Sequence, residues 1–153
     1  SITPDNRRDP FCTTSVETSV LYIRYYGLSP KAWRVRDLNG AQMVFTRTAT
    51  NPGLTNRLWE VEGPCAAVAN GYFVLQPNRV GREDNEYGEL AVDFYGTSQV
   101  IDPRGNFVGE RGSGEHEEIL IRDLDMDMVQ QMRDDWQFYR DRRPESYTSI
   151  PKP

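Results

Sequence analysis

The residues between 19 and 45 constrain the fold more than any other part of the chain, because their pattern is that of two strands separated by one helix. Ser29 and Pro30 suit the N-cap and the first position of a helix, and Asn39 with Gly40 suits its end. Strand, helix and strand in close succession favour a parallel pair with a right-handed crossover. We therefore predict an α/β fold in which helices cover at least one face of a sheet. The expected elements are a strand over 19–25, a helix over 31–38 and a strand over 41–45.

Apolar periodicity and turn residues predict further elements along the rest of the chain. Gly63 and Pro64 fall inside the next expected helix, where proline either kinks the helix or delays its start. The expected elements are a helix over 58–70, a strand over 72–75 that ends at 78–81, a loop over 82–89, strands over 94–101 and 118–122, a hairpin turn over 102–105 with a return strand from 107, and a closing helix capped by Asp125.

Composition is that of one globular domain. The chain has 153 residues, 37% of them hydrophobic, and three Trp, eight Tyr and six Phe supply large surfaces for a core. A net charge of −5 argues against a nucleic-acid partner. The sequence has no run of about twenty apolar residues, so no transmembrane segment is predicted. We expect an extended N-terminal arm over 1–18, a folded region over 19–139 and an extended C-terminal tail over 140–153.

Cysteine and histidine usage gives little support for a metal or cofactor. Cys12, Cys65 and His116 are too few for a zinc site or a disulfide framework, which favours a reducing intracellular compartment, the cytoplasm or an organelle such as the mitochondrion. The acidic runs at 83–86 and 115–118 lack calcium-loop spacing and are typical of solvated surface. The glycines of 109–114 lack a phosphate-loop signature. No cofactor is expected.

One set of segments, in order along the chain, carries a resemblance to a known family. The segments are 39–45 with 48–50, 67–70 with 78–83, 94–98 with 102–105, and 124–125 with 140–147. They resemble the nitrilase superfamily of carbon–nitrogen hydrolases, and most of all its β-ureidopropionase and N-carbamoyl amidohydrolase branch. The resemblance covers roughly residues 20–147. It implies an αββα sandwich, of which this chain is the C-terminal half, completed by another chain or by an oligomer contact.

The resemblance also implies a position for the family's nucleophilic cysteine, and that position is Arg24 in this chain. Family members use a Cys nucleophile, a Glu general base and a Lys that stabilises developing charge. A guanidinium is a permanent cation without an acceptor, so Arg24 cannot attack a carbon centre. The Glu and Lys positions lie upstream of the residues present here. Cys12, in the expected arm, and Cys65, in a helix, are interpreted as ordinary thiols.

The closing helix and the tail are predicted to carry an interface. The apolar stripe Met128, Val129, Met132 and Trp136 is interpreted as core or subunit contact. In the family, the matching tail segment extends onto a neighbour, which favours docking over a solvated tail, with an aromatic anchor. The expected contact residues are Met132, Trp136, Arg140, Arg142, Arg143 and Tyr147.

Arg24 and the absent upstream half together predict a protein without catalysis: a nitrilase-like pseudoenzyme that serves as a structural or interaction subunit among other protein chains. The alternative is one chain of a split or cleaved amidohydrolase whose Glu and Lys lie on a companion. A third hypothesis is a binding module that holds a carboxylate in a relic pocket near Arg24.

Overall fold

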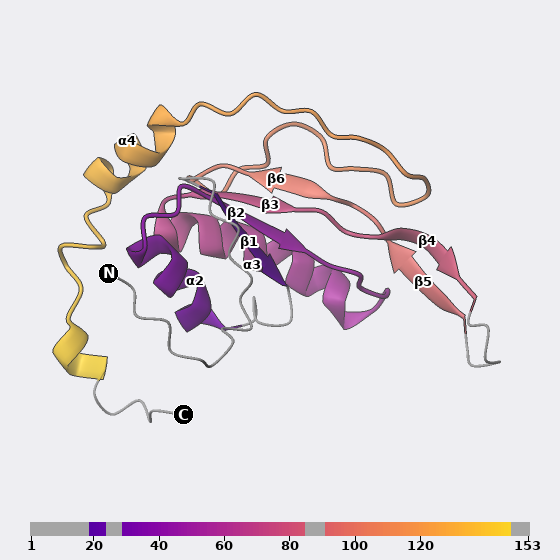
Figure 1. Ribbon diagram of the computed structural model, residues 1–153, viewed down its shortest axis with the longest axis horizontal. Coiled ribbons are helices and arrows are strands. Elements are labelled where there is room, and N and C mark those ends of the chain that lie inside the picture. Colours follow the sequence, from indigo (N-terminus) through magenta and orange to yellow (C-terminus); the bar gives the residue numbers. More distant parts are fainter. Residues whose placement is uncertain (1–18, 24–28, 85–90, 148–153) are drawn as a thin grey trace, which may run out of the picture.

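The computed structural model describes residues 19–23, 29–84 and 91–147, and these form a mixed α/β structure (Figure 1). The predicted arm over 1–18 lies outside the described residues. The elements are β1 (Ser19–Ile23), α2 (Pro30–Leu38), β2 (Met43–Arg47), α3 (Leu54–Asn70), β3 (Phe73–Gln76), β4 (Val80–Glu83), β5 (Val92–Tyr95), β6 (Gln99–Ile101), α4 (Asp127–Asp135) and the 3₁₀ helix η1 (Pro144–Tyr147).

A four-stranded sheet in the order β1-β2-β3-β6 is the centre of the fold. β1 and β2 are parallel, as the strand–helix–strand pattern predicts, and β2 and β3 are parallel as well. β6 returns antiparallel to β3. A second, two-stranded antiparallel sheet of β4 and β5 extends from the main sheet (Figure 1). Three adjacent parallel strands thus end at the same edge of the main sheet.

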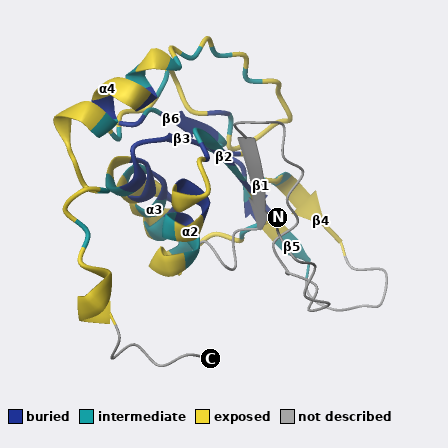
Figure 2. Cartoon of the chain, turned by 60° about the vertical axis from the view of Figure 1, so that its left-hand side comes forward, coloured by how far each residue is buried: buried dark blue, intermediate teal, exposed yellow. Residues whose placement is uncertain are grey.

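Helices α2 and α3 cover one face of this sheet, and the hydrophobic core lies between the sheet and these helices (Figure 2). Val44, Val74 and Ile101 stand in one row across β2, β3 and β6, and each is fully buried. Trp33 from α2 packs against Tyr72 with ring centroids 6.3 Å apart. Burial of such side chains is the main favourable term in forming the fold.

Helix α3 comes unusually close to the sheet at Gly63. A Cβ added there would lie 2.7 Å from Ile101 Cδ1 and would collide with the Gln76 amide. The helix begins at Leu54, earlier than predicted, because the Asn56 side chain accepts a hydrogen bond from the Gly53 amide at 2.7 Å. Pro64 therefore lies inside the helix and does not delay its start.

Two predicted strands are wrong, and the return strand expected from 107 is reduced to a single bridge between Ile101 and Phe107. Residues 94–101 form two strands, because Gly96 and Thr97 both have positive φ (56° and 53°) and turn the chain between the two sheets. Residues 118–122 have the apolar pattern of a strand but belong to no strand, because no described strand lies beside them to complete the hydrogen bonding. The segment 78–81, expected to end a strand, leads into β4.

Helix α4 ends earlier than the predicted periodicity suggests. The N-cap is Met126 and not the predicted Asp125, whose carboxylate lies one residue earlier and accepts a hydrogen bond from the Asp127 amide at 3.1 Å. The helix ends at Asp135, and Trp136 follows as its C-cap. The described part of the tail is not extended throughout, since a turn over 138–141 and η1 fold it. Within the described part of the chain, no helix has the length and apolar character needed to cross a membrane.

We expect Gly63→Ala to lower the free energy of unfolding by about 1–3 kcal/mol, since an extra methyl group forces α3 away from the sheet. Urea denaturation of the purified protein measures this. Val61→Ala, at an exposed position of the same helix, is the matched control and should stay within about 0.5 kcal/mol of wild type. Equal effects of the two substitutions would contradict the proposed close packing.

Candidate functional site

The carboxyl edge of the three parallel strands is the candidate functional site. In open α/β sheets, ligands bind outside the carboxyl ends of the strands. Here β1, β2 and β3 end at Ile23, Arg47 and Gln76. Arg24 follows β1 directly in the sequence, but it lies outside the described residues. The described part of the edge therefore comes from the segments after β2 and β3.

Asn78 is the centre of a hydrogen-bond network at this edge. Its backbone forms a parallel bridge with Thr48, and its amide N–H donates to Ser98 Oγ at 2.9 Å. Its side-chain Nδ2 donates to the Gly96 carbonyl at 2.7 Å, and its Oδ1 accepts from the Thr50 amide at 3.3 Å. One side chain thus connects the segments after β2 and β3 to the corner between β5 and β6.

Tyr95 connects the same network to the first turn of α3. Its hydroxyl lies 2.9 Å from the Thr50 hydroxyl and donates to the Thr55 carbonyl at 3.4 Å. The ring meets Trp59 edge-on at 6.4 Å, and Trp59 Nε1 donates to the Thr97 carbonyl at 2.9 Å. The polar groups of the edge are therefore occupied in holding the loops together.

A polar hollow of about 470 Å³ lies beside Asn78. The Arg79 guanidinium there lies 4.8 Å from the centre of the Phe94 ring and 2.6 Å from the Glu83 carboxylate. Both charged partners are half exposed, so this pair contributes little to stability. Side chains that contribute to the hollow are Asn78, Arg79, Arg82, Ser98, His116 and Glu117.

The serine and histidine of this hollow do not form a catalytic pair. Ser113 Oγ lies 3.0 Å from His116 Nδ1, but it also accepts the Glu115 and His116 amides and so closes a tight turn. Cys65 is exposed on α3, and Cys12 lies outside the described residues. No group of three His, Cys, Asp or Glu side chains suited to a metal ion occurs in the part of the chain that the structure describes.

Comparison with known proteins identifies the family. Residues 6–134 match the model of the carbon–nitrogen hydrolase family. The chain belongs to this family. The predicted resemblance is thus confirmed, and the match begins inside the segment predicted as an arm.

Individual relatives support the same assignment. An N-carbamoylputrescine amidase of Arabidopsis thaliana is 35% identical over 77% of this chain and 42% of its own length. A β-ureidopropionase of the same plant is 31% identical over 88% of this chain and 35% of its own length. A carbon–nitrogen hydrolase structure from Helicobacter pylori G27 superposes with a TM-score of 0.80 and 28% identity, over 88% of this chain and 49% of that one. The chain spans less than half the length of these relatives, and the partial α/β fold agrees with that fraction.

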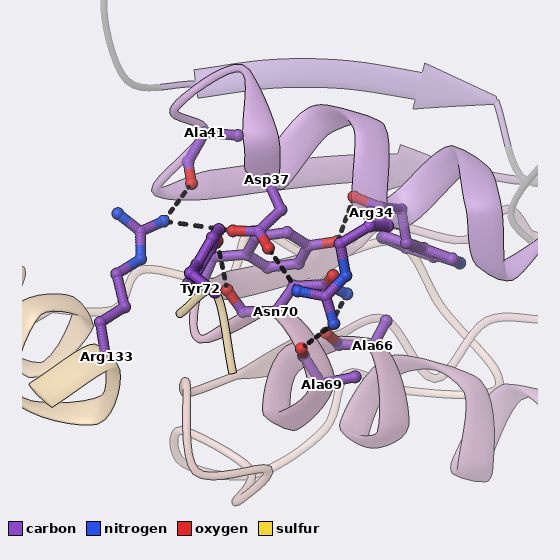
Figure 3. Close-up of polar contacts among 10 residues, drawn as sticks. Arg34, Asp37, Ala41, Ala66, Ala69, Asn70, Tyr72 and Arg133 are labelled. Carbon is purple, nitrogen blue, oxygen red and sulfur yellow. Dashed lines mark hydrogen bonds and ion pairs between the residues drawn. The ribbon is translucent and has the colours of Figure 1, made fainter. Parts of the chain in front are cut away.

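A second polar cluster in this carbon–nitrogen hydrolase chain joins three helices around Asp37 (Figure 3). The Asp37 carboxylate is fully buried and receives Arg34 Nη1 at 2.8 Å and Arg133 Nη2 at 3.4 Å. Arg34 also donates to the Ala69 carbonyl at 2.5 Å, and Arg133 to the Ala41 carbonyl at 3.0 Å. Burial raises the pKa of Asp37 to about 6, and the two arginines offset only part of that rise. The cluster holds α4 against α2 and the end of α3.

The predicted interface residues divide between the core and the surface. Met132 is buried among the described residues, so its side chain contributes to the core of this chain, and its predicted contact with another chain stays a prediction. Trp136 is 57% exposed and stacks on Phe138 at 5.6 Å. Arg140 and Arg143 are exposed and lie apart from the groove described next.

Two further predicted contact residues, Arg142 and Tyr147, share one groove. Its volume is about 800 Å³, and it lies between α2 and the tail. Apolar side chains dominate its walls. They belong to Pro30, Val35, Leu38, Ala69, Phe138 and Tyr147.

We expect Asn78→Asp to lower the free energy of unfolding by about 1–3 kcal/mol, because a carboxylate cannot donate to the Gly96 carbonyl. Hydrogen exchange of the Gly96 amide, which donates to the Arg79 carbonyl, should accelerate in the same variant, because the corner at Gly96 loses its bond to the side chain at position 78. Asn51→Asp, at an exposed nearby position, is the control and should change stability by less than about 0.5 kcal/mol. A stable variant with unchanged exchange would show that Asn78 does not hold the edge.

A second prediction concerns the pH dependence of stability. Because the folded-state pKa of Asp37 is raised from 3.8 to about 6, the folded protein binds this proton more tightly than the unfolded chain does. The stability that Asp37 contributes is therefore present below about pH 4 and is lost as pH rises through 6. The free energy of unfolding of wild type minus that of Asp37→Asn should fall by about 1–3 kcal/mol between pH 4 and pH 7. A difference that rises with pH would mean that the arginines outweigh burial.

Proposed function

We propose that this chain has no catalytic activity and is a structural or interaction subunit, with a carbon–nitrogen hydrolase-type fold, of a larger protein assembly. The observation that carries the proposal is Arg24. It is the residue that follows the carboxyl end of β1, and the family resemblance places the nucleophilic cysteine there. One relative, an amidase from Nesterenkonia sp. AN1, is described as adding acrylamide at its active-site cysteine. A guanidinium cannot perform that attack.

The described carboxyl edge supports a structural role in a second way. Asn78, Thr50 and Tyr95 direct their polar atoms at one another and at neighbouring backbone, at distances of 2.7–3.4 Å. A serine that replaced the cysteine as nucleophile would need a base oriented by a third group. The Ser113 hydroxyl instead accepts two backbone amides and stabilises a turn. These hydrogen bonds keep the loops in one conformation, and a structural subunit needs loops of fixed conformation.

The alternative is one chain of a split or cleaved amidohydrolase. The polar hollow of about 470 Å³ beside Asn78 favours it, because such a hollow can admit an amide or ureido group. Under this alternative a companion polypeptide brings the Glu, the Lys and a thiol. The non-catalytic subunit remains the preferred proposal, because the alternative requires three groups from elsewhere and the preferred one requires none.

The deciding measurement is ammonia release from N-carbamoylputrescine, β-ureidopropionate and simple amides, using the protein purified with its native partners. We expect no turnover above buffer, because no thiol stands at the position after β1. Any turnover abolished by iodoacetamide overturns the proposal. Cys12→Ala and Cys65→Ala then locate the thiol: loss of turnover in either variant assigns it to this chain, and retention in both assigns it to the companion.

A further inference from the structure

We propose that the apolar groove between α2 and the C-terminal tail binds an amphipathic carboxylate, a hydrocarbon chain that ends in one carboxylate group. The groove lies on the exposed side of α2, and the residues that line it do not belong to the carboxyl edge of the sheet. The inference is therefore independent of whether the chain catalyses a reaction, and its failure would leave the proposed function untouched.

The walls of the groove are apolar and open to solvent. Val35 and Leu38 of α2 are 50% and 43% exposed, and Phe138 and Tyr147 of the tail are 38% and 48% exposed. Exposed apolar side chains that gather on one surface mark a binding site. The volume of about 800 Å³ lies within the range of roughly 300–1000 Å³ that small-molecule sites occupy. The walls thus suit the hydrocarbon part of a small ligand.

Two cationic side chains border these apolar walls. They are Lys31 of α2 and Arg142 of the tail, and neither forms an ion pair in the part of the chain that the structure describes. The Asp141 carboxylate also borders the groove, but it pairs with Arg140 at 3.0 Å. An anionic head group would therefore neutralise two charges that the described chain leaves unpaired. Because Asp141 repels a second negative charge, a monoanion fits better than a dianion.

The hydrogen-bonding groups at the groove favour a carboxylate over a peptide. Lysine and arginine side chains carry donors and no acceptor. Arg34 borders the groove as well, but its guanidinium already donates to Asp37 and to the Ala69 carbonyl (Figure 3). A polypeptide would bring backbone donors as well as acceptors, and its donors would meet mainly apolar walls. A carboxylate brings acceptors alone, and a guanidinium can donate two parallel hydrogen bonds to it.

The tail wall of the groove is held in place by the chain itself. The Tyr139 hydroxyl donates to the Asn70 carbonyl at 3.3 Å, and the centre of its ring lies 5.8 Å from the Arg34 guanidinium. The tail turns at this point, because the Asp141 amide donates to the Gln137 carbonyl at 3.1 Å. A preformed site loses little affinity to the ordering of its own residues. The groove therefore needs no rearrangement before a ligand enters.

Calorimetric titration of the purified full-length protein with sodium decanoate, below the concentration at which decanoate forms micelles, tests the site. We expect one molecule to bind per chain. Decanol has the same chain without the charge and should bind at least about ten-fold more weakly, because it forms no charge-assisted hydrogen bonds. Absence of decanoate binding, or equal affinity for decanol, overturns the proposal. Tighter binding of decyl phosphate overturns the choice of a monoanionic carboxylate.

Substitutions at matched positions locate the ligand. Val35→Glu places a negative charge in the wall of the groove and should weaken decanoate binding at least about ten-fold. Val61→Glu, on α3 at a position 45% exposed and outside the groove, should leave the affinity within about two-fold of wild type. Equal effects at positions 35 and 61 overturn the proposal. A dimer in sedimentation velocity that Val35→Glu dissociates also overturns it, because a second copy of the chain then fills the groove.

A pair of neighbouring arginines tests the head group. Arg142→Gln should weaken decanoate binding about five- to ten-fold, because the charge-assisted bonds are lost. Arg143→Gln removes an exposed charge outside the groove and should leave the affinity unchanged. Neither substitution should alter decanol binding. Equal losses in the two variants would show that net charge and not the groove attracts the carboxylate, which overturns the proposal.

Hydrogen exchange provides an independent readout of contact with the tail. The Arg142 amide donates to the Tyr139 carbonyl at 3.4 Å. A ligand that contacts both α2 and the tail stabilises this turn, so the amide should exchange at least about three-fold more slowly at saturating decanoate. The Thr48 amide, which donates to the Pro77 carbonyl at the carboxyl edge, is the control and should be affected less. An Arg142 amide that exchanges at one rate with and without decanoate overturns the proposal.

Discussion

The close contact between α3 and the sheet at Gly63 is the constraint on which the other features depend. Because Gly63 has no side chain, α3 packs close to the sheet. Gln99 Nε2 can then donate to the Trp59 carbonyl of the helix at 2.8 Å and to Gln76 Oε1 of the sheet at 2.7 Å. Through Trp59 the same helix fixes the corner at Thr97, and through Thr55 it fixes Tyr95. The helix α3 therefore supports the carboxyl edge from beneath, in addition to the hydrogen bonds that Asn78 makes between the loops of the edge.

The sequence was sufficient for features set by local chemistry and insufficient for those set by distant contacts. Ser29, Pro30 and Asn39 mark the bounds of α2 because caps act within one turn. The corner at Gly96 and Thr97 was missed because the run 94–101 alternates well enough for one strand, and only the Asn78 bond to Gly96 fixes the break. The strand predicted over 118–122 was wrong because apolar alternation is a local signal, whereas a strand needs a hydrogen-bonded neighbour, and none is described beside this segment.

The candidate site shows the same division. Arg24 could be singled out only by resemblance, because a lone arginine after a strand has no physical signal of its own. Asn78 was visible in the sequence as a strand end, but its role depends on Thr50 and Gly96, which lie 28 and 18 residues away. Arg34 and Asp37 are spaced as an ordinary surface pair, and their spacing does not reveal that Asp37 is buried and is also contacted by Arg133, 96 residues later.

The end of α3 has a consequence for the order in which the chain folds. The last carbonyls of a helix have no intrahelical donor, and here donors come from both directions along the chain: Arg34 supplies Ala69, and the Tyr139 hydroxyl supplies Asn70 at 3.3 Å. During synthesis Arg34 leaves the ribosome before α3, whereas Tyr139 leaves long after it. The last carbonyl of α3 therefore gains its side-chain donor only when the segment after α4, which carries Tyr139, has been synthesised and has docked.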